Sequence, residues 1–556
     1  MKKVLLFLFV GLQFMSFAYL TINQDSIRGA LRPERNCFDV TFYDLSVKID
    51  PEERKIFGKN DIYFKAVHES KTIQIDLFRQ YQVVKIELYV PIDSTGIEEV
   101  IPASYKKVED ALFITFAESI KVGKNYRLQI SYFGKPNIAK KAPWDGGFVW
   151  DKDSLNRHFC GVACEGWGAS SWWPCKDHLS DEPDSMKMKF KVLKGYDCIS
   201  NGQLINHYQE TEIGGNYNDS EVFEWKVTYP INSYNVTFYL GKFKKISDWY
   251  LSEGDSLSTE FYALDYNYEK AKKHFKQVHP MLRVYEGLFG KFPFWNDGFK
   301  LVEAPYLGME HQSGIAYGNK YKKGYLGNHP KGIEFDYIII HETGHEYWGN
   351  SISMNDIADM WIHEGFCTYS EVLYVENIYG EESMIDYLRT QRRFKNDRPI
   401  IGNYDVNEEG SSDMYNKGSW MLHTIRNYIG NDTLWLAIIK QFHLDFKLKN
   451  TNTTEVLNWF ENKLGKEVKD LFVRYLYKAD IPVLEYQKKR FLWKKSVFLK
   501  WKSESPDFNL PILVNGLKVN PSSEWKKIKM KNFKELRKQF DWRFALYDIE
   551  EVSKKK

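Results

Sequence analysis

The chain has 556 residues, 43% of them hydrophobic and 16% aromatic, and this composition excludes a disordered protein. A chain of this length is expected to fold into two to four domains. Its formal net charge is only +3, from 77 basic and 74 acidic residues, so the charge gives no reason to expect nucleic acid as a partner.

The first segment, residues 1–18, has the pattern of a secretory signal peptide. Lys2 and Lys3 precede an apolar run, and the small residues Ser16 and Ala18 mark a cleavage site after Ala18. This predicts a secreted or periplasmic protein, with a retained membrane anchor as the alternative. No later stretch is apolar enough to cross a bilayer, so we expect no stable membrane insertion once the signal is removed.

Three further regions follow along the chain. Residues 19–248 consist of short alternating runs, such as FDVTFYDLSVKID and YRLQISYFG, separated by turn-forming residues, which predicts an antiparallel β domain. Residues 249–481 begin with a strand pair and then take up a mostly helical period. Residues 482–556 alternate again and predict a small β-sandwich-like domain. The predicted fold class is therefore a multidomain α+β protein.

The helical region contains the motif HETGH. His341 and His345 are four apart, so on a helix they are rotated by only about 40° from each other and both rings can reach one ion. Glu364 stands nineteen positions later, about 28 Å away along a continuous helix, and needs a turn in the chain to join them. Gly349 provides a stop signal, and Asp356 is a candidate cap for a second helix.

These residues predict one Zn²⁺ ion per chain. Two histidines and one glutamate leave the fourth zinc position open, which is typical of a catalytic site. Glu342 lies beside the first ligand and can accept a proton from the attacking water. The alternative interpretation is a pair of histidines that only pack a helix.

The same string resembles the gluzincin metallopeptidases of the M1 aminopeptidase family. HExxH is followed by eighteen residues and then a glutamate, within WIHEGF, which is similar to the family's WLNEGF-like string. GMEH at 308–311 resembles the GAMEN motif, and YNKG at 415–418 resembles the YxKG motif. The resemblance implies a saddle-shaped N-terminal β domain and a thermolysin-like, mostly helical zinc domain. It also implies a small C-terminal β-sandwich without the large helical domain of many members.

The resemblance also implies roles for individual residues. An edge strand at Gly308 and Met309 would hold the peptide, and Glu310 would meet its free ammonium group. Glu165 matches a position that helps to hold the same amine, although an exposed loop carboxylate is the alternative. Tyr415 would donate a hydrogen bond to the developing oxyanion, a role that a tyrosine at the start of a helix does not usually have.

Glu371 is a further candidate. It lies two turns after Glu364 on the same helical face, so its carboxylate is expected to fix the tautomer of one ligand histidine. A solvated glutamate is the alternative.

Together these features predict a zinc-dependent aminopeptidase that cleaves the N-terminal peptide bond of peptides with a free N-terminus. Glu342 would assist the attacking water. The alternatives are an epoxide hydrolase, a thermolysin-like endopeptidase, or a catalytically silent peptide-binding protein on the same fold. The sequence predicts neither the oligomeric state nor the preferred N-terminal residue.

Overall fold

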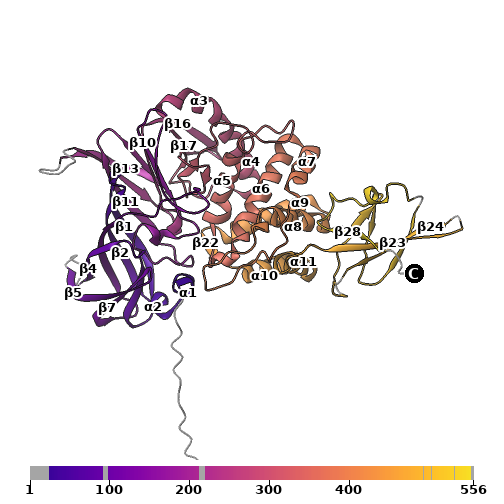
Figure 1. Cartoon of the computed structure of the whole chain (residues 1–556), viewed down its shortest axis with the longest axis horizontal. Coiled ribbons are helices and arrows are strands. Elements are labelled where there is room, and N and C mark those ends of the chain that lie inside the picture. The colour runs from indigo at the N-terminus through magenta and orange to yellow at the C-terminus, as the bar shows by residue number, and fades with distance from the viewer. Residues whose placement is uncertain are drawn as a thin grey trace, which may run out of the picture.

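A computed structural model shows three parts arranged in a row (Figure 1). A β-rich N-terminal part, a helical middle and a small β C-terminal part confirm the predicted multidomain α+β class. Within the described chain, no helix is both long and apolar enough to cross a membrane. The predicted signal peptide, 1–18, lies outside the described residues. The structure describes residues 24–91, 98–211, 219–492, 494–502, 504–506, 508–530 and 533–552.

The N-terminal part contains an eight-stranded sheet of order β13-β14-β11-β1-β2-β8-β4-β5, a four-stranded sheet of order β12-β15-β10-β9 and a three-stranded sheet of order β3-β7-β6. The elements are α1 (Gln24–Gly29), α2 (Pro33–Asn36), β1 (Phe38–Asp50), β2 (Lys55–Ala66), β3 (Ser70–Asp76), β4 (Gln82–Pro91), β5 (Glu98–Ile101), β6 (Ala103–Val108), β7 (Ala111–Ile120), β8 (Asn125–Gly134), β9 (Gly147–Lys152), β10 (His158–Ala163), β11 (Ser185–Leu193), β12 (Asp197–Ser200), β13 (Gln203–Glu210), β14 (Ser220–Val227) and β15 (Phe238–Gly241).

The large sheet departs from the predicted antiparallel arrangement at one pair. β1 is antiparallel to β2, but it runs parallel to β11, from Phe42 opposite Ser185 to Lys48 opposite Lys191. Two antiparallel strands can be joined by a short turn that is visible in the sequence, whereas two parallel strands need a long crossover connection. The partner of β1 is distant in the sequence, so the alternating pattern alone could not reveal it.

The middle part combines a five-stranded sheet of order β16-β17-β18-β20-β19 with a bundle of helices. β19 forms one edge of this sheet, and an edge strand was predicted at Gly308 and Met309. The predicted boundary at 248 falls inside β16. The elements are β16 (Phe243–Ser252), β17 (Asp255–Leu264), α3 (Tyr268–His274), α4 (Val278–Phe289), β18 (Phe299–Glu303), β19 (Gly308–Met309), β20 (Ile315–Tyr317), α5 (Tyr337–His345), β21 (Ile352–Met354), α6 (Trp361–Tyr379), α7 (Glu381–Gln391), α8 (Asn416–Ile429), α9 (Asp432–Phe446), β22 (Lys449–Thr451), α10 (Thr453–Leu464) and α11 (Lys466–Tyr477).

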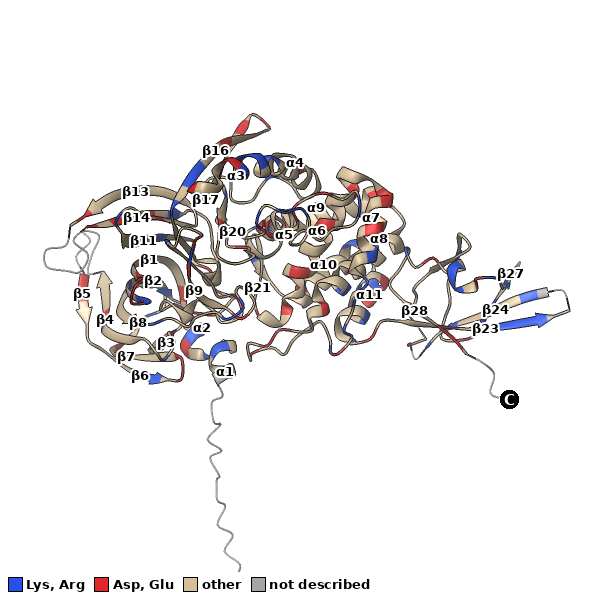
Figure 2. Cartoon of the chain, turned by 45° about the horizontal axis from the view of Figure 1, so that its top comes forward, with Lys and Arg blue, Asp and Glu red and all other residues tan. Residues whose placement is uncertain are grey.

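The C-terminal part is a four-stranded sheet of order β27-β24-β23-β28 with a small β25-β26 hairpin. Figure 2 shows basic residues toward the projecting ends of β23 and β24. The predicted boundary at 481 lies in the connection between α11 and β23. The strands are β23 (Val483–Phe491), β24 (Lys494–Trp501), β25 (Ile512–Val514), β26 (Leu517–Val519), β27 (Lys526–Met530) and β28 (Asp548–Glu551).

The helix α6 is the centre of the middle part. Every residue from Trp361 to Val375 is buried, so this helix has no solvent face over its first four turns. Aromatic rings stack around it, with Phe366 5.0 Å from Trp348 and 5.2 Å from Phe442 between ring centroids. Dense packing of large rings holds the helix rigidly, which fixes the side chains it presents to α5.

Candidate active site

The chain reverses between α5 and α6, as the turn signals predicted. Asp336 caps α5 by accepting a hydrogen bond from Ile338 N at 3.0 Å. After the second histidine the backbone leaves the helical conformation, and Gly349 has a φ of +135°, which glycine adopts without steric cost. Asp356 then accepts from Ala358 N at 2.9 Å, so it caps a short 3₁₀ turn, Ile357–Asp359, and not α6 itself as predicted. The reversal lays α6 against α5.

Three side-chain atoms meet where the two helices face each other. The Nε2 atoms of His341 and His345 are 3.2 Å apart, and Glu364 Oε2 lies 3.5 and 3.3 Å from them. Tetrahedral zinc with ligands at about 2.0–2.1 Å places those ligand atoms about 3.3 Å from one another. Glu364 Oε2 is buried and makes no hydrogen bond within the described residues. The three atoms therefore fit the ligands of one zinc ion.

Both histidines are held from behind through their other nitrogen. His341 Nδ1 lies 2.7 Å from Glu371 Oε1. The Tyr387 hydroxyl donates a hydrogen bond to the other oxygen of that carboxylate, Oε2. His345 Nδ1 lies 3.0 Å from the carbonyl oxygen of Trp348. A proton on each Nδ1 satisfies these acceptors and leaves the Nε2 lone pairs free for a metal. The structure thus places Glu371 where the sequence predicted a carboxylate behind a ligand.

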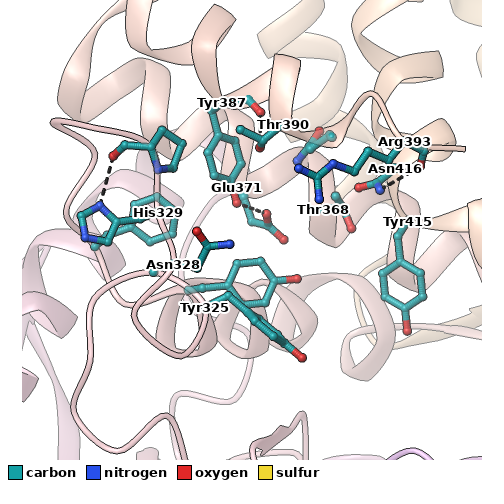
Figure 3. A pocket seen from close by; sticks show the side chains of 15 residues that line it. Tyr325, Asn328, His329, Thr368, Glu371, Tyr387, Thr390, Arg393, Tyr415 and Asn416 are labelled. Carbon is teal, nitrogen blue, oxygen red and sulfur yellow. Dashed lines mark hydrogen bonds between the residues drawn. The ribbon is translucent and has the colours of Figure 1, made fainter.

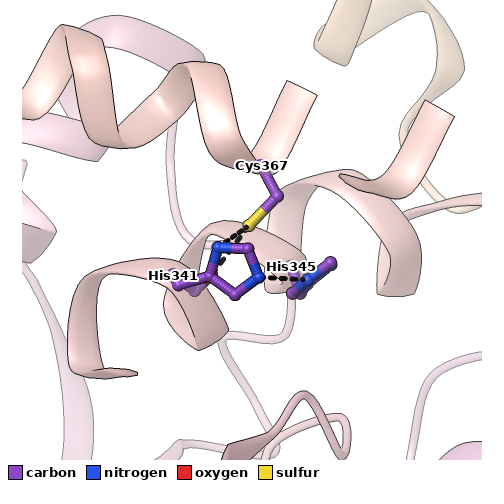
Figure 4. Close-up of side chains that lie close together, drawn as sticks. All are labelled: His341, His345 and Cys367. Atoms are coloured by element: carbon purple, nitrogen blue, oxygen red, sulfur yellow. Dashed lines mark hydrogen bonds between the residues drawn. The ribbon is translucent and has the colours of Figure 1, made fainter. Parts of the chain in front are cut away.

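A buried thiol also lies near this cluster, but outside the ligand set. Figure 4 shows Cys367 on the Nδ1 side of the His341 ring, whereas the Nε2 atom faces His345. Cys367 Sγ is 3.7 Å from that Nδ1 and donates to the carbonyl oxygen of His341 at 2.8 Å. This hydrogen bond joins α6 to α5. Cys367, His341 and His345 each offer a ligand atom within 4.8 Å of the other two, but the thiol hydrogen is used in the bond to that carbonyl oxygen.

Glu342 lines a cleft of about 430 Å³ together with the three metal-ligand residues. A Cβ atom at Gly308 would lie 2.4 Å from Glu342 Oε1, so the edge strand β19 approaches α5 closely and a side chain at this position would displace the Glu342 carboxylate. Burial raises the pKa of the Glu342 carboxyl to about 8. A divalent cation on the neighbouring ligands favours the carboxylate form, which is the form that accepts a proton.

Glu310 stands at the end of β19, on the wall of the same cleft. Its Oε1 accepts a hydrogen bond from Tyr234 OH at 3.1 Å, and its carbonyl oxygen accepts from Asn350 Nδ2 at 2.7 Å. The carboxylates of Glu310 and Glu342 and a ring nitrogen of His345 offer atoms that all lie within 4.8 Å of one another. Glu310 is thus fixed from both sides at a short distance from the metal ligands.

Glu165 reaches this cleft from the N-terminal part. Its Oε1 is shielded from solvent and finds no hydrogen-bond donor in the described chain. Burial and the neighbouring carboxylates of Glu310 and Glu364 raise its pKa well above the usual range for a glutamate. Acidic side chains collected this closely favour the binding of a cation between them.

Tyr415 joins the metal-ligand cluster from the start of α8. Its hydroxyl donates to Glu364 Oε1 at 2.7 Å, and its side chain lines the cleft. The neighbouring motif residues explain this placement. Lys417 Nζ donates to carbonyl oxygens after α11 at 2.7 and 2.9 Å, and a Cβ at Gly418 would lie 3.0 Å from Gly365 Cα. Lysine anchors α8, and glycine lets it touch α6.

Several residues of the site were not predicted from the sequence. Tyr234 binds the side chain of Glu310, Tyr387 binds Glu371, and Asn350 binds the backbone carbonyl of Glu310, directly after β19. Tyr234 and Asn350 are 76 and 40 positions from Glu310, whereas Tyr387 is 16 positions from Glu371, on the next helix. The chain carries 36 tyrosines, so no local pattern separates these two from the tyrosines of the core.

Comparison with known protein families agrees with this geometry. Residues 308–475 match the model of the peptidase family M1 domain. Residues 40–235 match the model of the peptidase M1 N-terminal domain. The chain belongs to peptidase family M1. The M1 domain match begins at β19 and ends in α11, so it contains all three metal-ligand residues.

Individual M1 relatives are distant. The chain is 23% identical to the tricorn protease-interacting factor F2 of Thermoplasma volcanium over 63% of this chain and 45% of that protein. It is 20% identical to a leucyl aminopeptidase of Saccharolobus solfataricus over 64% and 45%. The chain thus spans about half the length of the curated relatives it matches.

A solved structure extends the likeness to the fold. The crystal structure of an M1 zinc metallopeptidase from Deinococcus radiodurans has a TM-score of 0.65 and 19% identity. The match covers 80% of this chain and 94% of that one. At this identity the likeness is one of fold.

Removing the carboxylate behind His341 is expected to weaken zinc binding. We expect Glu371→Ala to lower zinc affinity by about 10- to 100-fold, because the His341 ring loses its oriented Nδ1 hydrogen bond. Competition with a chromophoric chelator measures this affinity. Tyr387→Phe removes only the bond to Glu371 and should have a smaller effect. Unchanged affinity in a folded Glu371→Ala protein would contradict the role of this carboxylate.

Proposed function

We propose that this chain is a zinc-dependent aminopeptidase that hydrolyses the N-terminal peptide bond of peptides. The observation that carries the proposal is the pair of carboxylates, Glu310 and Glu165, at one wall of the cleft that contains the zinc ligands. A free ammonium group supplies the cation that this acidic wall favours. A blocked N-terminus would leave the charges unpaired, which costs binding energy.

The cleft residues divide the chemistry among them. Zinc, when bound by His341, His345 and Glu364, supplies Lewis-acid polarisation of the scissile carbonyl and lowers the pKa of the attacking water. Glu342 accepts the proton of that water at a carboxylate oxygen and delivers it to the leaving amine. The Tyr415 hydroxyl donates a hydrogen bond to the negative charge that develops on the carbonyl oxygen.

The acidic wall also favours exopeptidase over endopeptidase activity. In an endopeptidase the substrate chain continues past this wall as an uncharged peptide. Such a chain would leave Glu310 and Glu165 without a cation in a buried cleft, which disfavours its binding. Export to a secreted or periplasmic location is part of the proposal and rests on the sequence of residues 1–18.

The proposed activity is tested with a panel of aminoacyl coumarylamides and their N-acetylated twins, with and without a zinc chelator. We expect chelator-sensitive hydrolysis of the free-amino compounds only. The panel also identifies the preferred N-terminal residue. Hydrolysis of the acetylated set would indicate an endopeptidase, and a zinc-loaded protein that cleaves neither set would contradict the proposal.

Neutralising the acidic wall should impair binding of the substrate amine. For Glu310→Gln we expect a decrease in kcat/KM of about 10- to 100-fold, since a hydrogen bond to a charged group contributes about 1.5–3 kcal/mol. Steady-state kinetics on free-amino substrates measures it, with zinc content as the control for site integrity. Wild-type kcat/KM in this variant would refute the role of Glu310 in amine binding.

A further inference from the structure

A second cavity, of about 460 Å³, adjoins the zinc cleft. Figure 3 shows its lining, with Thr368 and Glu371 from α6 and Tyr387 from α7. The loop that carries His329 and the segment after α7 that carries Arg393 complete the walls.

The cavity lies on the leaving-group side of the metal ligands. Tyr325, Tyr337 and Tyr415 line both the cavity and the zinc cleft, so the two spaces are continuous. Glu165 and Glu310, which mark the amine end, line only the zinc cleft. An aminopeptidase substrate has one residue before the scissile bond, and everything after that bond extends away from the amine end. The cavity is therefore placed to receive the residue that follows the scissile bond.

Hydrogen-bond donors collect in this cavity. Thr368 is 3% exposed and Gln391 is 6% exposed, and neither Thr368 Oγ1 nor Gln391 Nε2 finds a hydrogen-bond partner in the described chain. Both side chains line the cavity. Buried polar groups are normally paired, so these two unpaired groups are available to a hydrogen-bond acceptor that enters the cavity.

Arg393 adds a positive charge to these donors. Figure 3 shows its side chain reaching back toward Thr390 and Thr368. Among the described residues, no carboxylate lies within salt-bridge distance of the Arg393 side chain. The carboxylate that lines the cavity, Glu371, is already bound by His341 Nδ1 and Tyr387 OH. The guanidinium is thus available for a ligand.

We propose that this cavity is a carboxylate-binding subsite for the residue that follows the scissile bond, with Arg393 as its specificity-determining residue. The inference rests on the proposed aminopeptidase function. A planar guanidinium matches a carboxylate geometrically, and the neutral donors of Thr368 and Gln391 complete the coordination of its oxygens. The carboxylate is either the C-terminus of a dipeptide or the side chain of an aspartate or glutamate at the second position.

Two substrate pairs distinguish these sources. With the preferred N-terminal residue X fixed, the first pair is X-Ala and X-Ala-amide, and the second is X-Asp-amide and X-Asn-amide. For at least one pair we expect the carboxylate member to have a kcat/KM about 10- to 100-fold higher, mainly through KM, which is the range of a charge-assisted hydrogen bond. Arg393→Gln should abolish this ratio.

Lys395→Gln is the matched control, because it removes the same charge from the same segment at a residue that does not line the cavity. It should preserve the ratio. Absence of a preference in the wild-type chain, or a ratio that survives Arg393→Gln or falls equally in Lys395→Gln, would overturn the subsite. Cleavage of X-Ala-amide and of the coumarylamide establishes the aminopeptidase separately, so a failed subsite and a failed enzyme give different results.

Discussion

Replacing Glu342 with glutamine is expected to lower kcat by about 10²- to 10⁴-fold, the usual contribution of a general base. Glutamine has nearly the same shape, so the approach of β19 to α5 at Gly308 is preserved, but its amide cannot accept the proton of the attacking water. Zinc content should remain unchanged, because the three converging ligand atoms belong to His341, His345 and Glu364 and none belongs to Glu342. Steady-state kinetics and metal analysis on the same preparation measure both quantities.

Glu409→Gln provides a matched control for this experiment. Glu409 also lines the zinc cleft, so its replacement removes a carboxylate from the same electrostatic environment without touching the proposed proton transfer. We expect its kcat to change far less than that of Glu342→Gln. Equal losses in the two variants would show that the cleft needs negative charge in general, and would contradict a specific role for Glu342 as the base.

The metal-ligand residues were predictable because their geometry is local. The four-residue spacing of His341 and His345 fixes their relative orientation on any helix. Glu364 can reach the two histidines only if the chain turns back after the first helix. Gly349 and Asp356 predicted such a turn from the sequence. The same logic placed Glu371 behind His341, since it lies two turns beyond Glu364 on a single helix.

The rest of the site depends on contacts between distant segments. Tyr234 reaches Glu310 across 76 sequence positions, and Asn350 reaches the backbone of Glu310 across 40. The parallel pairing of β1 with β11 escaped the sequence analysis for the same reason, because no turn joins the two strands. Only tertiary packing brings these groups together. Hydrophobic periodicity predicts helices and strands, but it does not predict which distant segments contact each other.

The site also depends on more than one part of the chain. Metal ligands and Glu342 belong to the helical middle, whereas Glu165 and Tyr234 come from the N-terminal β part. Asn235 Nδ2 donates to Asn350 Oδ1 at 2.8 Å and so ties the two parts together beside Glu310. In the proposed function, one part of the chain therefore supplies the zinc ligands and Glu342, the other completes the acidic wall, and specificity for a free N-terminus would require both.

Removal of zinc is expected to abolish hydrolysis, and added Zn²⁺ should restore it. The residues that remain can bind a peptide, but they cannot polarise its carbonyl or supply a nucleophile at neutral pH. Mg²⁺ and Ca²⁺ should not restore activity, because two imidazole ligands and one carboxylate suit zinc, whereas these hard cations prefer oxygen ligands. Dialysis against a chelator, metal analysis and reconstitution with each cation form the experiment.

His345→Ala separates loss of the metal from an indirect effect of the chelator. This variant removes one of the three converging atoms, so it should have low activity and a zinc affinity too weak for reconstitution to recover wild-type rates. Zinc should also raise the Tm of the wild-type chain by mass action, because the ligand atoms converge only in the folded state, and this increase should be smaller in His345→Ala. Full hydrolysis by a chain that metal analysis shows to be zinc-free would refute the metal mechanism, since Glu342 and Tyr415 alone offer only proton transfer and one hydrogen bond.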